Sequence, residues 1–472
     1  MKGFVVVLME TQFSWTKQWY PISPLSYLDP SRPTPVTLLG KKLVIWRDEN
    51  QKWIVMDDVC PHKLAQLSLG SIKEDGTLMC RHHGWCFNGE GKCTNIPMLI
   101  GSKAQETACD SLRSHVATYP TQVTQGLLWV WPDDSSTAFE DSHSKQPATI
   151  PECELDISAT DWHMTEVPVG YTVSVESSFD PSHAQYLHEG IGYFSPKTAV
   201  PIEHFDAVGE MSAEAGFTLK HTGYNLLNKD MEAMRQFTPP CCNTTIYRYP
   251  NGKTNLFQLY FVPTQPGHCR YIGKFIADGG SVKKNFLFEM LPKNLRTGLR
   301  HSSTYKLSDQ DLTVMHSQEV IESSLDKKWQ KAYFMPSPAD VGIVTFRKWL
   351  DEFAGGSPLW KGGVEVSAKD LNDEQLYDRW HRHTKHCPSC RDSVMIIEKV
   401  RTFFIICTGS FALLSLVLLL IGTPLKLALT STIIGVLSSL LSYMADDLRQ
   451  RFISSIPKRG LPLVEVYGSN AK

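Results

Sequence analysis

The feature that most constrains this chain of 472 residues is a pair of short cysteine–histidine segments near its N-terminal end. The first reads C-P-H from Cys60 to His62, and the second reads C-R-H-H from Cys80 to His83. Two thiolates and two imidazoles suit a borderline-soft metal, so by ligand count alone the set fits either zinc or an iron–sulfur centre. The flanking residues must decide between the two.

Those flanking residues resemble a Rieske [2Fe–2S] centre, in which two histidines replace two cysteines on one iron. Gly84 and Trp85 directly follow the second segment. Ala65 and His82 stand where respiratory Rieske proteins carry a disulfide, which favours the ferredoxin and oxygenase branch. Zinc is the less favoured alternative, because zinc sites more often pair Cys-X2-Cys with two histidines. The resemblance implies these cluster ligands: Cys60, His62, Cys80 and His83.

Length and charge limit the classes of protein to consider. A chain of 472 residues predicts two soluble domains and an appendage. The net charge of -2 gives no basic surface for nucleic acid, so we expect no nucleic-acid partner. The 12 cysteines lack the spacing of a secreted disulfide scaffold, and a cluster that needs free thiolates favours a reducing compartment.

Short strands around the two segments predict an all-β first domain. Residues 42–46 and 52–56 are typical of a hairpin, and residues 126–131 of a closing strand. Residues 133–146 are rich in Ser, Asp and Thr, which is the composition of a linker. We therefore predict a Rieske domain over residues 1–140.

A second motif, E-S-S-F-D-P-S-H-A-Q-Y-L-H over residues 176–188, contains a carboxylate and two histidines. On a helix, Asp180 and His183 share a face, whereas His188 turns away unless the helix is locally widened. This spacing differs from the histidine pair of a zinc metalloprotease. Two histidines with a carboxylate from elsewhere instead suit the facial triad of a non-haem Fe(II) oxygenase.

With both motifs, the chain resembles a Rieske non-haem iron oxygenase, in which a cluster domain precedes a catalytic domain of the helix-grip type. The resemblance implies that His183 and His188 bind iron. It also implies a head-to-tail homotrimer, in which Asp180 links this iron to a cluster histidine of a neighbouring subunit, here His83. The family often has an asparagine shortly before this aspartate, where residues 176–178 read E-S-S, so we expect a differently tuned contact.

The third iron ligand is expected to be a carboxylate far downstream. Asp311, in the segment L-S-D-Q-D-L-T-V-M-H-S-Q-E-V, lies seven residues before Gln318 and resembles the family's third ligand. We expect Asp311 to open a helix that Ser308 or Asp309 caps. Asp309 is the second candidate ligand. Alternatively, both aspartates only cap the helix and complement its dipole.

A later segment narrows the resemblance. P-S-P-A-D-V-G-I-V-T-F-R-K-W-L, residues 336–350, is similar to a chloroplast and cyanobacterial subgroup that is pheophorbide a oxygenase-like. Alternating residues within 203–270 predict an antiparallel sheet that walls a pocket. We place the catalytic mononuclear iron domain at residues 141–395, and the fold class is α+β.

The segment H-C-P-S-C, residues 386–390, contains Cys387 and Cys390 in charged surroundings that we expect to be exposed. One interpretation is a regulatory redox pair addressed by thioredoxin, which the subgroup resembles here. The alternatives, weighed evenly with it, are half a zinc site or two thiols without a role, since no second cysteine pair follows. His301 is assigned no role beyond packing.

Two uncharged apolar stretches, residues 403–422 and 427–445, are each near the ~20 residues that a bilayer-spanning helix needs. They predict a transmembrane hairpin within a third part, residues 396–472, and a buried soluble hairpin is the alternative. By the positive-inside tendency, basic flanks place both ends and the catalytic domains on the cytoplasmic or stromal side. The flanking residues are Lys399, Arg401, Arg449, Arg451, Lys458 and Arg459.

Together these features predict a membrane-anchored oxygenase that inserts oxygen from O2 into a hydrophobic substrate. The resemblance favours a chlorophyll-derived tetrapyrrole, in a cyanobacterial membrane or a chloroplast thylakoid or inner envelope. The alternatives are the same chemistry on a sterol or carotenoid, or a membrane redox sensor or translocon component. The chain has no Gly-rich dinucleotide loop after a strand, so we expect a ferredoxin or separate reductase to supply electrons.

Overall fold

The structure is a computed structural model that describes residues 13–153, 161–277, 286–361 and 370–454. It divides into two compact units, the first made of residues 1–280 and 314–370, the second of residues 281–313 and 371–472. Helix α6 (Lys293–Ser324) continues through the division without a break. Of the basic residues expected to flank the hairpin, Lys458 and Arg459 lie outside the described residues.

The N-terminal part of the first unit consists mainly of β-strands, as the sequence predicts, with helix α1 (Ser102–Asp110) in addition. The expected hairpin is formed by β3 (Lys41–Arg47) and β4 (Trp53–Asp57), which pair antiparallel. They lie in a sheet of order β2-β3-β4-β9, with β2 (Thr34–Leu38) and β9 (Thr118–Tyr119) at its edges.

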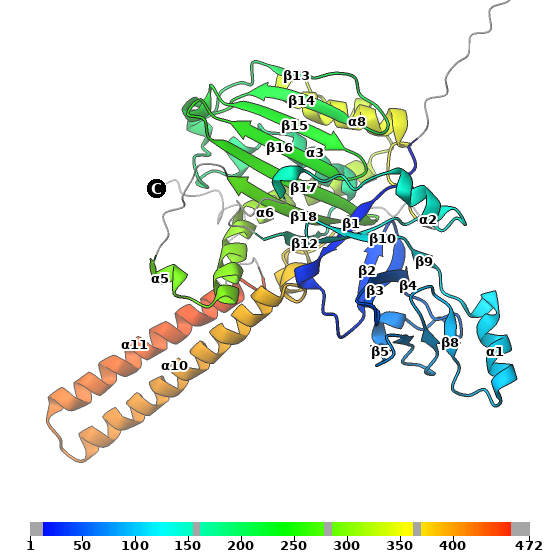
Figure 1. Ribbon diagram of the computed structural model, residues 1–472. Coiled ribbons are helices and arrows are strands. Elements are labelled where there is room, and N and C mark those ends of the chain that lie inside the picture. The colour runs from blue at the N-terminus through cyan, green and yellow to red at the C-terminus, as the bar shows by residue number, and fades with distance from the viewer. Residues whose placement is uncertain (1–12, 154–160, 278–285, 362–369, 455–472) are drawn as a thin grey trace, which may run out of the picture. The chain divides into compact units, whose positions relative to one another are not determined.

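Two further antiparallel sheets complete this part (Figure 1). The expected closing strand is β11 (Leu127–Val130), which lies between β1 (Tyr20–Pro24) and β10 (Thr121–Thr124). Four short strands form the sheet that carries the second cysteine–histidine segment. They are β5 (Ser71–Ile72), β6 (Leu78–Met79), β7 (Cys86–Phe87) and β8 (Cys93–Asn95), followed by helix α1 (Ser102–Asp110).

Residues 133–146, expected to form a linker, are instead folded against the N-terminal segment. They contain helix α2 (Ala138–Asp141) and a 3-10 turn over Ser142–Ser144. The Trp19 indole donates to the carbonyls of Ser142 (3.2 Å) and Lys145 (3.0 Å). Ser and Asp are also residues that hydrogen-bond nearby backbone, so a polar composition is compatible with this ordered turn.

A seven-stranded antiparallel sheet of order β12-β18-β17-β16-β15-β14-β13 forms the centre of the first unit (Figure 1). This sheet confirms the strands expected within residues 203–270. Its members are β12 (His163–Val167), β13 (Phe205–Ala207), β14 (Phe217–Thr222), β15 (Glu232–Thr238), β16 (Cys242–Arg248), β17 (Thr254–Gln265) and β18 (His268–Ala277).

Two helices pack on this sheet and carry or support the second motif. They are α3 (Tyr171–Phe179) and α8 (Val341–Phe353). Phe346 of α8 is fully buried, with its ring 5.3 Å from that of Phe237 on β15 and 6.3 Å from that of Phe179 on α3. The short helices α4 (Ala184–Leu187) and α7 (Trp329–Ala332) complete the described helices of this unit.

The described part of the second unit is helical. Besides the N-terminal part of α6 it contains α5 (Phe286–Glu289), α9 (Asp373–Leu376), a π-helical segment η9 (Trp380–Thr384), α10 (Pro388–Leu420) and α11 (Leu425–Gln450). Helix α10 begins 15 residues before the apolar stretch at residue 403, so the expected domain boundary at residue 396 falls inside it.

Helices α10 and α11 run side by side as a hairpin (Figure 1). Small residues of α11, including Ala428, Ser431 and Gly435, are buried against α10, and Ser431 Oγ donates to the Phe411 carbonyl at 2.8 Å. Large apolar side chains are exposed, for example Leu420 at 76%. By length and composition, both helices are long and apolar enough to cross a membrane.

Replacing Phe346 by alanine removes the ring that joins α3, α8 and the sheet. We expect Phe346→Ala to lower the free energy of unfolding by about 3–5 kcal/mol, because a large buried ring leaves a cavity. Lys348→Ala, an exposed position of the same helix, is the matched control and should change stability little. Urea unfolding in detergent, followed by tryptophan fluorescence, measures both, and equal effects would contradict the packing described.

Candidate active site

The two cysteine–histidine segments fold into the same turn twice. In each turn the cysteine N–H donates to the carbonyl five residues later, at 2.8 Å, and the cysteine carbonyl accepts from the N–H four residues later, at 2.9 Å. The residues at that fourth position are Leu64 and Gly84, with φ of 59° and 72°. Glycine adopts this left-handed conformation without strain and leucine does not, so the backbone hydrogen bonds of the turn hold the exposed Leu64 there.

Both turns place sulfur inside and imidazole outside. Cys60 and Cys80 are 1% and 2% exposed, whereas His62 is exposed and His83 is half-buried. The two histidine rings lie 4.4 Å apart, and His62 stacks on Trp85 at 4.8 Å. The donor set therefore fits a [2Fe–2S] cluster, which two buried thiolates and two more exposed imidazoles would hold.

The acid–base state of this donor set also suits a metal cluster. Burial, with the neighbouring Cys80 contributing, raises the pKa of Cys60 to about 11, so a thiolate there needs a positive partner such as a metal. Desolvation and the nearby His82 and His62 lower the pKa of His83. Its imidazole is thus held neutral, which is the form that binds metal.

In the second motif a break between two helices, rather than a widened helix, brings the histidines together. Helix α3 ends at Phe179, and Asp180 is its extended C-cap residue. His183 and His188 are the residues that flank the single turn of α4, and their ring centroids lie 5.2 Å apart. A proline at position 181 favours this break, because proline disfavours helical backbone in the residue before it.

Asp180 is positioned as a partner of His183. One carboxylate oxygen accepts from the Ser182 N–H (2.9 Å) and hydroxyl (2.6 Å), and the other lies 3.6 Å from His183 Nδ1. Burial opposes ionisation of Asp180, but the hydrogen bonds from His183 and Ser182 outweigh it and lower its pKa. An ionised Asp180 is therefore available to orient the imidazole of His183.

Buried amides that the sequence analysis missed support α4. The Gln185 side-chain oxygen accepts from the Asn225 amide at 2.8 Å and from the Ser195 N–H at 3.2 Å, and both amide residues are 1% exposed. Asn225 also donates to Thr198 Oγ1 at 2.7 Å. Gln185 lies within the histidine motif, but Asn225 lies 37 residues after His188 and carries no signal in the sequence.

Helix α6 carries both candidate carboxylates, Asp309 and Asp311, on different faces. The donor atoms of His183, His188 and Asp311 all lie within 4.8 Å of one another. Asp309, two residues earlier and so on another face of the helix, forms buried ion pairs with Arg379 and with Arg382, the latter at 3.3 Å. Only Asp311 of the two joins the histidines.

The expected helix start near Asp311 is wrong. Helix α6 begins at Lys293, so Asp309 and Asp311 lie in its interior and neither they nor Ser308 cap it. The polar segment was a misleading signal, because buried arginines stabilise Asp309 within the helix. Cys387 and Cys390, expected to be exposed, are likewise buried, at 2% and 1% exposure.

Glu176, one of the residues found where the family often has an asparagine, belongs to a buried ion pair. Glu176 is 2% exposed, pairs with Arg347 of α8, and accepts from the Gln318 amide at 3.1 Å. Arg347 also contacts Glu322 at 2.8 Å. Burial raises the pKa of Glu176, and Arg347 offsets part of this effect. This pair fastens α3, which leads into the histidine motif, to α8.

Replacing Arg347 by an uncharged residue should make the free energy of unfolding depend on pH, because Glu176 then loses its cationic partner. In Arg347→Met the pKa of Glu176 rises further, so the folded protein keeps a proton that the unfolded chain releases above its ordinary pKa of about 4.5. The free energy of unfolding of the variant then falls as pH rises. At a pH where Glu176 is charged in the folded variant, the loss relative to the unmodified protein is about 3–5 kcal/mol.

The measurement is urea unfolding at several pH values between 5 and about 8, a range set by the ordinary carboxyl pKa and a raised one. The double variant Glu176→Gln/Arg347→Met is the control and should lose most of the added pH dependence. If single and double variants respond to pH alike, Glu176 is not the responsible group.

The chain is similar to proteins of one oxygenase family. Residues 18–120 match the Rieske [2Fe-2S] domain, and residues 237–329 match Pheophorbide a oxygenase. Flavonoid 8-hydroxylase 2, chloroplastic, from Ocimum basilicum is 31% identical over 408 residues, which cover 81% of this chain and 74% of that protein. Pheophorbide a oxygenase, chloroplastic, from Oryza sativa subsp. japonica is 31% identical over 428 residues, 85% of this chain and 77% of that protein.

A solved structure supports the fold. The crystal structure of dicamba monooxygenase bound to dicamba matches with a TM-score of 0.54 at 17% identity, over 72% of this chain and 98% of that one. The fold class, a Rieske domain with antiparallel sheets and mixed helices, is therefore confirmed, as are a [2Fe–2S] cluster and a mononuclear iron as cofactors. The chain belongs to the pheophorbide a oxygenase-like family of Rieske non-haem iron oxygenases.

Proposed function

We propose that this oxygenase is membrane-anchored and inserts oxygen into a chlorophyll-derived tetrapyrrole, pheophorbide a or a related chlorophyllide or protochlorophyllide. The observation that carries the chemistry is the meeting of His183, His188 and Asp311 within 4.8 Å. Two imidazoles and a carboxylate form the facial triad that leaves iron positions open. The tetrapyrrole is supported by relatives such as the rice pheophorbide a oxygenase.

Each predicted ligand of the iron and of the cluster has a role in this proposal. His183, His188 and Asp311 hold the iron, and the cluster ligands are Cys60, His62, Cys80 and His83. The cluster would supply electrons one at a time, and the iron would supply the activation of O2. Asp180 holds the His183 imidazole in one orientation, as carboxylates do for many metal-binding histidines.

The oligomeric part of the proposal comes from the family resemblance. In a homotrimer, Asp180 of one subunit would contact the cluster histidine equivalent to His83 on its neighbour. A ferredoxin or separate reductase would deliver electrons to the cluster, whose two histidines lie at the exposed side of their turns. That exposure supports a route for electrons through the imidazoles.

The membrane anchor is supported by the surface of the α10–α11 hairpin. Small side chains lie between its helices and large apolar ones lie outside, which is the packing expected where lipid replaces water. At its open end, Arg401 contacts Asp446 at 3.2 Å and Arg449 contacts Glu398 at 2.5 Å, so charge gathers there. We propose a thylakoid, inner-envelope or cyanobacterial membrane, with the catalytic domains on the stromal or cytoplasmic side.

A second candidate substrate class is favoured by one relative. The Ocimum basilicum protein named flavonoid 8-hydroxylase 2 is as similar as the rice protein, at 31% identity. The same chemistry on a smaller lipophilic aromatic compound is therefore the alternative. Sterols and carotenoids, the alternatives expected from the sequence, belong in the same test.

The substrate is tested by oxygen consumption of the reduced, detergent-solubilised protein with a panel of chlorophyll derivatives, flavonoids, sterols and carotenoids. We expect uptake and an oxygenated product, detected by mass, with a tetrapyrrole. His183→Ala should abolish both, whereas His204→Ala, an exposed histidine, should retain them. Turnover of a flavonoid and of no pigment would overturn the tetrapyrrole assignment.

The iron ligands are tested by metal content rather than activity. Asp311→Ala should lose one iron per chain and keep the two irons and the electron paramagnetic signal of the cluster, because only the triad is broken. Asp309→Asn keeps the shape of a side chain that contacts arginines instead, so the folded variant should lose stability but keep all three irons. If Asp309→Asn instead lost one iron and Asp311→Ala kept all three, Asp309 would be the iron ligand.

A further inference from the structure

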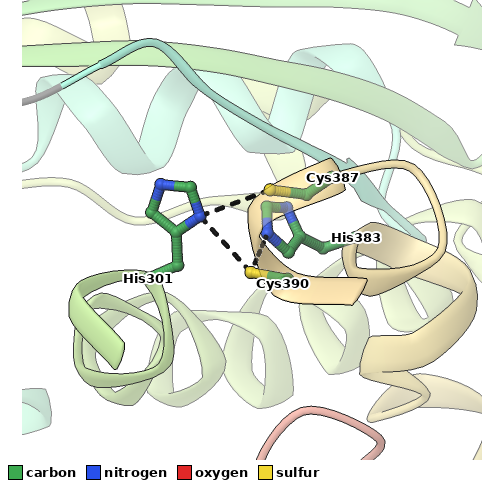
Figure 2. Close-up of side chains that lie close together, drawn as sticks. All are labelled: His301, His383, Cys387 and Cys390. Carbon is green, nitrogen blue, oxygen red and sulfur yellow. Dashed lines mark hydrogen bonds between the residues drawn. The ribbon is translucent and has the colours of Figure 1, made fainter. Parts of the chain in front are cut away.

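Two histidines and two cysteines meet inside the second unit, apart from the cluster and iron residues. His301 lies on α6, His383 on η9, and Cys387 and Cys390 at the start of α10. All four side chains are buried, between 0% and 9% exposed, and their donor atoms lie within 4.8 Å of one another. Figure 2 shows both imidazoles and both sulfurs turned toward a common point.

The distances between donors match the edges of a small tetrahedron. Nδ1 of His301 lies 3.6 Å from the Cys387 sulfur and 3.5 Å from that of Cys390, and Nε2 of His383 lies 3.2 Å from Cys390 (Figure 2). With zinc–sulfur bonds of ~2.3 Å and zinc–nitrogen bonds of ~2.0 Å, tetrahedral geometry puts sulfur and nitrogen about 3.5 Å apart. One ion fits between these four atoms.

We propose that His301, His383, Cys387 and Cys390 form a structural zinc site. Two thiolates and two imidazoles in tetrahedral order suit zinc, and four protein donors leave no open position for substrate. Cys-X2-Cys is a frequent zinc-binding spacing, and the beginning of a helix favours thiolates because its backbone N–H groups are positive.

Other uses of the two cysteines fit the geometry less well. A dithiol exchanged by thioredoxin must be reached by another protein, and these sulfurs are buried at 2% and 1% exposure. The cysteines are not joined in a disulfide. A second Rieske-type cluster would place the cysteines and histidines on different irons, whereas here each of the two sulfurs lies within 3.6 Å of His301 Nδ1.

The site lies among other buried residues of the second unit, such as Tyr305 and Tyr377. It joins the N-terminal part of α6 to η9 and to the first turn of α10, the first helix of the candidate membrane hairpin. The buried ion pairs of Asp309 with Arg379 and Arg382 join the same elements, and the Tyr305 ring lies 5.1 Å from that of His383. Zinc would thereby fix the helix that carries Asp311, ten residues after His301.

The test is the metal content of the full-length protein purified in detergent without chelators. We expect one zinc per chain in addition to iron, lost in Cys387→Ser and in His301→Ala. Cys407→Ser, on the same helix, is the matched control and should retain zinc. This readout is separate from the proposed oxygenase activity, because zinc can be present whatever the substrate is.

Two measurements on the unmodified chain keep the test decisive if the variants do not fold. Growth with cobalt should give the visible absorption of tetrahedral Co(II) bound by thiolate. Cys387 and Cys390 should resist a maleimide reagent until a strong chelator removes the metal, as shown by mass spectrometry. Absence of stoichiometric zinc, an additional iron in its place, a Cys387–Cys390 disulfide, or ready labelling of the native protein would each overturn the proposal.

Discussion

The buried carboxylate of Asp309 sets the rotation of helix α6. It is fully buried and paired with Arg379 and Arg382, and removal of either charge would leave the other uncompensated. With this face fixed, Asp311 projects from another face and His301 lies two to three turns earlier. This ion-pair cluster therefore favours the rotation of α6 in which Asp311, rather than Asp309, is available as the proposed iron ligand and His301 meets the cysteines.

A comparable constraint operates around the histidine motif in the first unit. The Glu176–Arg347 pair and the ring contacts of Phe346 hold α3 against α8, and the chain leaves α3 at Asp180. Rigid packing on this side allows the short α4 turn to position its two histidines. The arrangement of the proposed iron ligands thus depends on buried contacts made by residues outside the proposed site.

Much of the architecture followed from local patterns. The strands of residues 42–46 and 52–56 and the antiparallel sheet follow alternation, and the apolar stretches mark the hairpin helices. The helix containing Asp311 was misjudged because polar residues in its interior resemble a cap. Residues 133–146 were misjudged because linker composition and ordered turns share the same amino acids. In each case tertiary partners outweighed a local preference.

The sequence by itself indicated the chemistry, because Cys60, His62, Cys80 and His83, together with the residues that flank them, resemble a Rieske centre. The gathering of distant residues was decided only by the tertiary structure. Asp311 was a candidate with a rival until its partners and those of Asp309 were visible. His301 carried no signal, since it lies 82 positions before His383 and only the packing of α6 brings the two together.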